Sequence, residues 1–203
     1  MTERESSAAI ILCGGKSTRM GTDKASLRIG SRTFLDHVCR QVATVVDVVV
    51  AVRSASQKLP ELPGDVRIQE DCWPDEGPLA GFLSGARHPD VAAGDVSRIW
   101  LGSCDAPFVQ PEVIRHLLEV PGNRDAVLVD TGSRLEPLSG VYRQTATDKL
   151  ESVFSSGERR LQAFVACLTV AAIQHDRLRR FDPDLAFLRN VNTHDDYERW
   201  VRC

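Results

Sequence analysis

The sequence predicts a single α/β domain: a doubly wound, mostly parallel β-sheet with helices on both faces. Short β-branched runs alternate with longer amphipathic stretches, and glycine or proline separates many of these segments. The runs are also apolar throughout, as expected for strands that are buried on both faces of a parallel sheet. The chain has 203 residues, which corresponds to one domain, and its 42% hydrophobic and 26% charged residues are typical of a globular protein.

The first half of the chain begins with a βαβ unit. A strand is expected at 8–12, where an apolar run stops at a glycine pair, and a helix at 34–45, with Thr33 as its N-cap. The β-branched run 46–52 predicts the second strand. The remaining expected strands lie at 66–69, 98–102, 126–129, 138–142 and 169–174, and the remaining helices at 82–87, 111–119, 144–154, 158–167 and 194–201.

Several classes of protein are disfavoured by composition. The longest nearly apolar runs, 45–52 and 161–173, are shorter than the roughly 20 residues of a membrane span. The polar, acidic N-terminus does not resemble a signal peptide, so a cytoplasmic location without membrane contact is expected. The six cysteines and five histidines show no spacing typical of a zinc site or a disulfide framework. The net charge of −3 gives no indication of a nucleic-acid surface.

The segment after the first expected strand combines glycine with basic residues. Five basic residues and one acid give residues 13–32 a local charge of +4; these are Lys16, Arg19, Lys24, Arg28 and Arg32 against Asp23. Glycine backbone can approach an oxygen-rich ligand closely, and basic side chains neutralise phosphates. The P-loop pattern fails because position 10 is isoleucine, and no glycine triplet has the dinucleotide-binding spacing. A phosphate-binding loop of another kind is therefore indicated.

Residues 12–24 resemble the signature loop of nucleotidyltransferases that share the sugar-nucleotide pyrophosphorylase fold, a Rossmann-like architecture. The spacing from Arg19-Met20-Gly21 to Asp23-Lys24 is the distinctive part. Within this group the chain is most similar to the molybdenum cofactor guanylyltransferases. Five further segments follow that family's order: 70–71 with 77–81, 104–108, 137–142, 157–160 and 190–193.

The resemblance implies that GMP is transferred from GTP to the terminal phosphate of molybdopterin, with release of pyrophosphate and with Mg²⁺ as cofactor. It also implies a division of the chain: residues 1–7 form a flexible tail and 8–203 the nucleotidyltransferase domain. Within this domain, 8–105 mainly bind the nucleotide and 106–203 mainly bind the acceptor. Transfer of this kind needs positioning and charge stabilisation rather than a covalent nucleophile.

The family's functional residues map onto matching positions of this sequence. Arg19, Lys24 and Asp105 are expected to be catalytic, with Asp105 as the metal ligand. The nucleotide-binding residues implied are Leu12, Cys13, Gly14, Gly15, Lys24, Asp71 and Asp105, and the acceptor-binding residues are Gly81, Arg159, Arg160, Asn190 and Asn192. Lys16 is a weaker candidate for phosphate binding.

The residues by themselves leave alternatives open. Asp105 could cap the helix that begins at Pro111, and Asp71 could be a solvent-facing acid in the run of acids at 70–76. Arg159, Arg160, Asn190 and Asn192 also suit a charged helix start and a turn.

The sequence departs from the family pattern at two positions. Cys13 stands where the family usually has alanine, so it is expected to be a small hydrophobe beside the base; the alternative is a thiol activated by nearby cations. The stretch 50–53 lacks the asparagine that many relatives carry near the end of the second strand, which puts that nucleotide contact in doubt.

Three rival functions remain at the level of sequence. A cytidylyltransferase acting on molybdopterin and a sugar-phosphate nucleotidyltransferase share the loop, although resemblance associates the Gly14–Gly15 pair with a purine. A nucleotide-sensing adaptor would be expected to lack Lys24 or Asp105. The expected partners are GTP, molybdopterin and, transiently, cofactor-synthesis proteins and acceptor molybdoenzymes, with the chain acting as a monomer.

Overall fold

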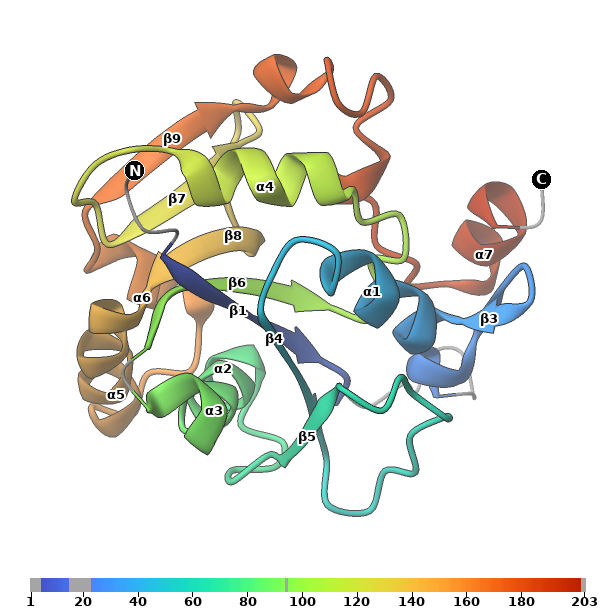
Figure 1. The fold of residues 1–203 in the computed structure, drawn as a ribbon, viewed down its shortest axis with the longest axis horizontal. Coiled ribbons are helices and arrows are strands. Elements are labelled where there is room, and N and C mark those ends of the chain that lie inside the picture. The colour runs from blue at the N-terminus through green and yellow to red at the C-terminus, as the bar shows by residue number, and fades with distance from the viewer. Residues whose placement is uncertain (1–4, 15–22, 94, 202–203) are drawn as a thin grey trace.

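A computed structural model describes residues 5–14, 23–93 and 95–201 of the chain. Seven strands form one sheet in the order β5-β4-β1-β6-β8-β7-β9 (Figure 1). Only β8 runs antiparallel to its neighbours in this sheet, which confirms the predicted mostly parallel arrangement. The strands are β1 (Ser6–Leu12), β4 (Val48–Arg53), β5 (Arg67–Glu70), β6 (Val96–Ser103), β7 (Ala126–Asp130), β8 (Leu135–Arg143) and β9 (Val170–Gln174).

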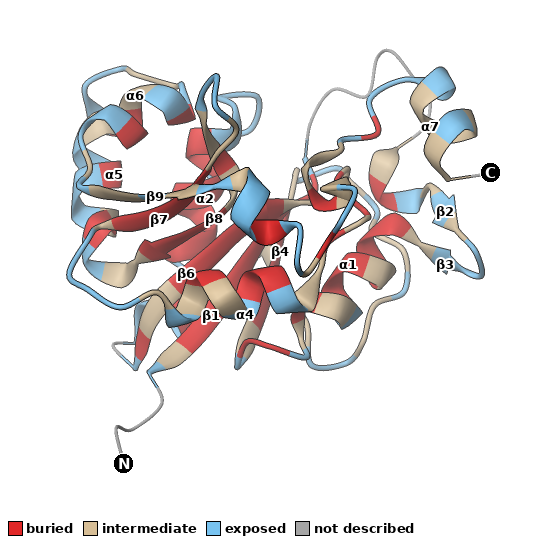
Figure 2. Ribbon diagram, turned by 90° about the horizontal axis from the view of Figure 1, so that it is seen from above, coloured by how far each residue is buried: buried red, intermediate tan, exposed pale blue. Residues whose placement is uncertain are grey.

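Helices cover both faces of the sheet, as the doubly wound prediction requires. One face packs against α1 (Phe34–Val42) and α4 (Pro111–Glu119). The other face packs against α2 (Pro78–Ala86), α5 (Thr147–Ser155) and α6 (Leu161–Ala166). The central strands β1, β4, β6 and β7 are consequently mostly buried, whereas the edge strand β5 and the outer sides of the helices are largely exposed (Figure 2). The other elements are α3 (Pro89–Ala92), α7 (His194–Trp200), the hairpin of β2 (Arg28–Ile29) and β3 (Arg32–Thr33), and the 3₁₀ helices η1 (Lys24–Ser26), η2 (Gln144–Ala146), η3 (His175–Leu178) and η4 (Ala186–Leu188).

Strand β1 lies between two hydrophobic cores. Because successive side chains point to opposite faces, Ile10 and Leu12 enter one core and Ile11 enters the other. The strand begins two residues earlier than expected. Ser6 and Ser7, which the sequence assigned to a tail, belong to it, and Asp47 Oδ2 accepts a hydrogen bond from the backbone nitrogen of Ser7 at 2.9 Å.

Helix α2 begins four residues before the expected helix at 82–87. Gly77 adopts a φ of 89°, which turns the chain, and Pro78 occupies the first helical turn. Its two glycines face the sheet: a Cβ on Gly85 would lie 2.6 Å from Cγ2 of Ile10. Close packing on β1 therefore explains a glycine-containing helix that residue propensity disfavours.

Other element boundaries depend on local signals. Thr33 caps α1 as predicted, its hydroxyl accepting a hydrogen bond from the backbone nitrogen of Asp36, and α4 has the predicted bounds. The expected helix at 144–154 is divided into η2 and α5, and that at 158–167 is shorter. No helix in the described ranges has the length and hydrophobicity needed to cross a bilayer.

The strand order creates a topological switch point beside β1. From β1 the chain passes through α1 to β4 on one side, whereas β6 pairs with β1 on the other side. Ligands in doubly wound sheets bind at such a point, outside the carboxyl ends of the strands. In this chain the segments after β1 and β6 meet there, and they contain Lys24 and Asp105.

Candidate active site

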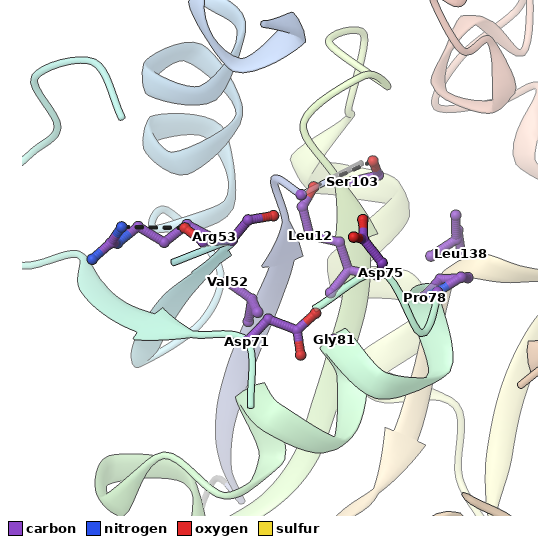
Figure 3. A pocket seen from close by; sticks show the side chains of 12 residues that line it. Leu12, Val52, Arg53, Asp71, Asp75, Pro78, Gly81, Ser103 and Leu138 are labelled. Atoms are coloured by element: carbon purple, nitrogen blue, oxygen red, sulfur yellow. Dashed lines mark hydrogen bonds between the residues drawn. The ribbon is translucent and has the colours of Figure 1, made fainter. Parts of the chain in front are cut away.

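A cavity of about 330 Å³ lies at the carboxyl ends of β1, β4 and β6, beside the start of α2 (Figure 3). Its size suits a small-molecule ligand, since such pockets range from about 300 to 1,000 Å³. Its walls mix apolar side chains with two carboxylates. The lining residues are Leu12, Gly14, Val52, Arg53, Ser54, Asp71, Asp75, Gly77, Pro78, Gly81, Ser103 and Leu138.

Asp71 lines this cavity with its carboxylate held by a fixed set of donors. Its Oδ1 accepts hydrogen bonds from the hydroxyl of Ser84 at 2.8 Å and from the backbone nitrogen of Trp73 at 3.0 Å. The Ser84 hydroxyl, fully buried in α2, in turn accepts from the backbone nitrogen of Cys72 at 3.0 Å. These bonds orient the carboxylate. Figure 3 shows Asp71 close to Val52 and Gly81, so a purely solvent-facing role for this acid is wrong.

Lys24 and Asp105, 81 residues apart in sequence, form an ion pair. The Nζ of Lys24 donates to Oδ2 of Asp105 at 2.8 Å and to Oδ1 of Asn192 at 2.6 Å. Both members of the ion pair are mostly covered, their side chains being 20% and 18% exposed. The structure thus brings together two residues predicted to be catalytic and one predicted to bind the acceptor.

Backbone contacts hold this cluster at the end of β6. The carbonyl of Asp105 accepts a hydrogen bond from the backbone nitrogen of Val191 at 2.8 Å, which places Asn192 alongside. Asp105 follows Ser103 of the cavity wall by two residues, so the cluster and the cavity adjoin. The alternative role of Asp105 as a helix cap is wrong, because Gln110 is the N-cap of α4.

The cluster can supply oxygen ligands to a divalent cation. Among the described residues, no group of three or more His, Cys, Asp or Glu side chains could hold a metal ion. In the cluster, the Asp105 carboxylate and the Asn192 side-chain oxygen are the protein groups that could contact such a cation. Such a donor set fits Mg²⁺, which usually takes one or two carboxylates and completes its shell with phosphates and water.

The predicted glycine-rich loop lies only partly within the described residues. Leu12 and Gly14 line the cavity, and a Cβ on Gly14 would lie 3.0 Å from the hydroxyl of Ser54, which would have to shift slightly. The predicted roles of Gly15, Lys16 and Arg19 fall outside the described residues.

Cys13 lies on the far side of β1 from the cavity. It is 5% exposed and packs in the core that contains α1 and α4. Burial raises the pKa of the Cys13 thiol well above its usual range, because a thiolate is costly in an apolar core. The activated-thiol interpretation is therefore wrong. Cys13 is a small hydrophobe, but its side chain belongs to the core rather than to the cavity wall.

The other predicted acceptor residues are distributed around the cavity edge and beyond. Gly81 lines the cavity, where a Cβ would lie 3.0 Å from Cδ2 of Leu12. Arg159 pairs with Glu76, next to the cavity residue Gly77, and its guanidinium stacks over Phe154 at 4.1 Å.

Arg160 and Asn190 do not lie on the cavity wall. Arg160 pairs with Glu158 at 2.7 Å, and this contact lowers the pKa of Glu158 to about 2. Asn190 is exposed, two residues before Asn192. Of the predicted acceptor residues, only Asn192 reaches the Lys24–Asp105 pair in the described structure.

The loop after β4 carries contacts that sequence reasoning missed. In the stretch 50–53, where many relatives were expected to carry an asparagine, Val50, Ala51 and Val52 are buried. Arg53 lines the cavity, but its guanidinium points away from Asp71 (Figure 3) and donates to the carbonyls of Ser54, Ala55 and Gln57 at 2.8–3.2 Å. The Arg53 contacts lie within four residues but follow no motif that is recognisable in the sequence, whereas the contact of Ser84 with Asp71 depends on how α2 packs beside the end of β5.

The chain is similar to known proteins over nearly its whole length. A family model described as a MobA-like NTP transferase domain matches residues 9–178. The chain is 30% identical to a molybdenum cofactor guanylyltransferase of Syntrophotalea carbinolica, over 96% of this chain and 90% of the relative. It is 32% identical to a probable molybdenum cofactor guanylyltransferase of Methanosarcina mazei, over 98% and 92% of the two chains.

Solved structures show the same fold. Molybdopterin-guanine dinucleotide biosynthesis protein A from Archaeoglobus fulgidus superimposes with a TM-score of 0.78 at 25% identity, over 97% of each chain. A 4-diphosphocytidyl-2C-methyl-D-erythritol synthase from Anaerococcus prevotii, 14% identical, superimposes with a TM-score of 0.69 over 96% of this chain and 93% of that one. The family model and the relatives together show that this chain is a nucleotidyltransferase and belongs to the MobA-like NTP transferase family, alongside the molybdenum cofactor guanylyltransferases.

Proposed function

We propose that this chain transfers GMP from GTP to the terminal phosphate of molybdopterin, forming the guanine dinucleotide cofactor and releasing pyrophosphate. The names of its relatives support the substrates. The observation that carries the proposal is the contact between Lys24 Nζ and Asp105 Oδ2 at 2.8 Å, beside a cavity of nucleotide-binding size. A cation and a carboxylate at one sheet edge are the groups that phosphoryl transfer requires.

The cavity would hold the guanosine part of GTP. Leu12 and Val52 offer apolar surface to the base, and Gly14 and Gly81 allow close approach to the backbone. Asp71 is an acceptor on the same wall, suited to the donor groups of the guanine edge or the ribose hydroxyls. The triphosphate would extend from the cavity toward Lys24.

Lys24 would neutralise the phosphates as a point charge and leave its present partners to do so. Asp105 would hold Mg²⁺, which supplies charge neutralisation between the phosphate oxygens when it is bound with the nucleotide. Asn192, whose side-chain oxygen accepts from Lys24, would donate its amide hydrogens to an incoming acceptor phosphate. No general base is needed, because a phosphate monoester is already largely ionised near pH 7, its second pKa being about 6.

The remaining expectations follow from the same function. Arg19, Cys13 and Gly15 complete the nucleotide side by family resemblance, through backbone groups in the case of Cys13. Arg159 and Arg160 would act on the acceptor side, where their present carboxylate partners would have to be exchanged for phosphate. We expect the chain to act as a cytoplasmic monomer that contacts cofactor-synthesis proteins and acceptor molybdoenzymes only transiently.

A melting scan with each of the four nucleoside triphosphates and Mg²⁺ tests the base assignment. A ligand at 100 times its Kd stabilises the folded state by about 2.7 kcal/mol, which corresponds to a rise of roughly 5–11 °C for a chain of this size. GTP is expected to give this rise and the other three nucleotides to give much less. Stabilisation by CTP instead would indicate a cytidylyltransferase, and indifference to all four would favour a non-enzymatic domain.

A further inference from the structure

One side-chain amide connects the end of β1 with the residue that precedes Lys24. The Nε2 of Gln57 donates to the carbonyl of Cys13 at 3.0 Å. The same nitrogen donates to the carboxylate of Asp23, at 2.9 Å to Oδ2 and 3.1 Å to Oδ1. An amide NH₂ has two hydrogens, so one can serve each partner. Gln57 is 44 residues from Cys13 and 34 from Asp23, so this bridge exists only in the folded chain.

The loop that carries Gln57 is itself held in place. The Oε1 of Gln57 accepts a hydrogen bond from the backbone nitrogen of Ser54 at 3.3 Å. This bond orients the amide so that its nitrogen faces Asp23. The backbone carbonyl of Gln57 accepts from the guanidinium of Arg53 at 3.0 Å, and Arg53 also pairs with Glu70 at 3.2 Å. Gln57 is therefore presented by a supported loop rather than by a freely rotating side chain.

The bridge leads directly to Lys24. Asp23 is the N-cap of η1, and its Oδ1 accepts from the backbone nitrogen of Ala25 at 3.0 Å. Lys24 is the first residue of that turn, so the Asp23 cap helps to fix the backbone from which the Lys24 side chain extends. Gln57 donates to this carboxylate and to the carbonyl of Cys13, so it fixes the position of the Lys24 backbone relative to the end of β1.

We infer that Gln57 is a positioning residue for GTP-dependent transfer: it sets the distance between the end of β1 and Lys24, and thereby where the Lys24 ammonium meets the phosphates. This inference rests on the proposed function. A catalytic group that is misplaced by about 1 Å can lose on the order of 100-fold in rate, so a bridge that fixes its origin contributes to catalysis without touching substrate.

The test replaces the amide by groups of similar shape. Gln57→Glu places a carboxylate against Asp23, and Gln57→Met removes the hydrogen bonds without adding charge. Gln174→Glu is the matched control, because the Nε2 of Gln174 donates to the carboxylate of Asp130 at 2.7 Å, away from the site. For each variant, kcat is measured for GMP transfer to molybdopterin, together with the melting temperature with and without GTP and Mg²⁺ at pH 8 and pH 5.

The inference predicts that Gln57→Glu lowers kcat by about 10–100-fold at pH 8. Gln57→Met lowers it less, and Gln174→Glu stays within about threefold of the parent chain, the loss expected when a surface contact is changed. At pH 5 the stabilisation by GTP in Gln57→Glu recovers toward that of the parent chain, because two facing carboxylates share a proton and the acid then donates to Asp23.

Two outcomes would overturn the inference. If the parent chain and both Gln57 variants are equally active and equally stabilised by GTP, the bridge has no role in positioning, although the proposed function stands. If the parent chain and Gln174→Glu show neither transfer nor stabilisation by GTP, the proposed function fails, and the inference fails with it.

Discussion

The substitution Asp105→Asn separates the catalytic role of this side chain from its role in stability. Asparagine has nearly the shape of aspartate but no charge. The backbone contact from Val191 to the carbonyl of residue 105 does not involve the side chain, so the segment should keep its place. The amide oxygen can still accept a hydrogen bond from Lys24.

The expected magnitudes follow from these contacts. In the variant the charged Lys24 still donates to a neutral oxygen, so what is lost is the charge–charge attraction of a partly covered ion pair, about 1 kcal/mol. For a chain of this size that corresponds to a fall of roughly 2–4 °C in Tm. The loss in rate should be far larger, on the order of 100- to 1,000-fold in kcat, because the charge is required where the phosphates and the metal meet.

GMP transfer and thermal melting are measured on the same preparation. Asp36→Asn is the matched control: Asp36 pairs with Arg40 at 2.8 Å on α1, and its side chain is 13% exposed against 18% for Asp105. Both variants should melt within a few degrees of the parent chain, and only Asp105→Asn should lose activity. Turnover of Asp105→Asn within tenfold of the parent chain would refute the assignment of Asp105.

Three further predictions concern the cavity and its supports. Ser84→Ala removes a donor to Asp71 and the acceptor of the Cys72 backbone N–H. It should raise the KM for GTP more than it lowers kcat and destabilise the fold by about 1 kcal/mol; an unchanged KM would show that this orientation is unimportant. Gly85→Ala should lower the free energy of unfolding by about 1–3 kcal/mol through overpacking, whereas Gly64→Ala, where a Cβ meets open space, should be nearly neutral. Equal losses of stability for the two variants in urea unfolding would contradict the overpacking argument. Cys13 should react with iodoacetamide at pH 8 far more slowly than the exposed cysteines, because its raised pKa keeps the thiol protonated. Labelling is measured by mass spectrometry, and rapid labelling of Cys13 in the native state would refute its burial.

Local signals predicted much of the fold correctly. Thr33 before an apolar periodic stretch predicted the cap of α1, and Pro111 predicted the start of α4, because capping and proline geometry act within one turn. Helix α2 was placed too late because its start was expected only after the Gly-Pro stretch at 77–81. The role of its two glycines appears only when the helix lies against β1, where a Cβ on Gly85 would lie 2.6 Å from Ile10 and one on Gly81 3.0 Å from Leu12.

The sequence likewise predicted one part of the candidate site correctly and another part wrongly. The carboxyl ends of parallel strands meet at one sheet edge, so residues that follow β1 and β6 were expected to converge, and Lys24 and Asp105 do so. The side chain of Cys13 was expected beside the base by family resemblance, whereas the alternation of side chains along β1 continues through Cys13 and directs it into the core.

The order of residue types along the chain determined the alternation of strands and helices, the glycine-rich turn and the residues able to bind phosphate, since these properties depend on near neighbours. Only the tertiary structure decided that Gln57 bridges Cys13 and Asp23, and that Ser84 orients Asp71. A hydrogen bond is directional and spans about 3 Å, so its partners are defined only after segments tens of residues apart have packed into their final register.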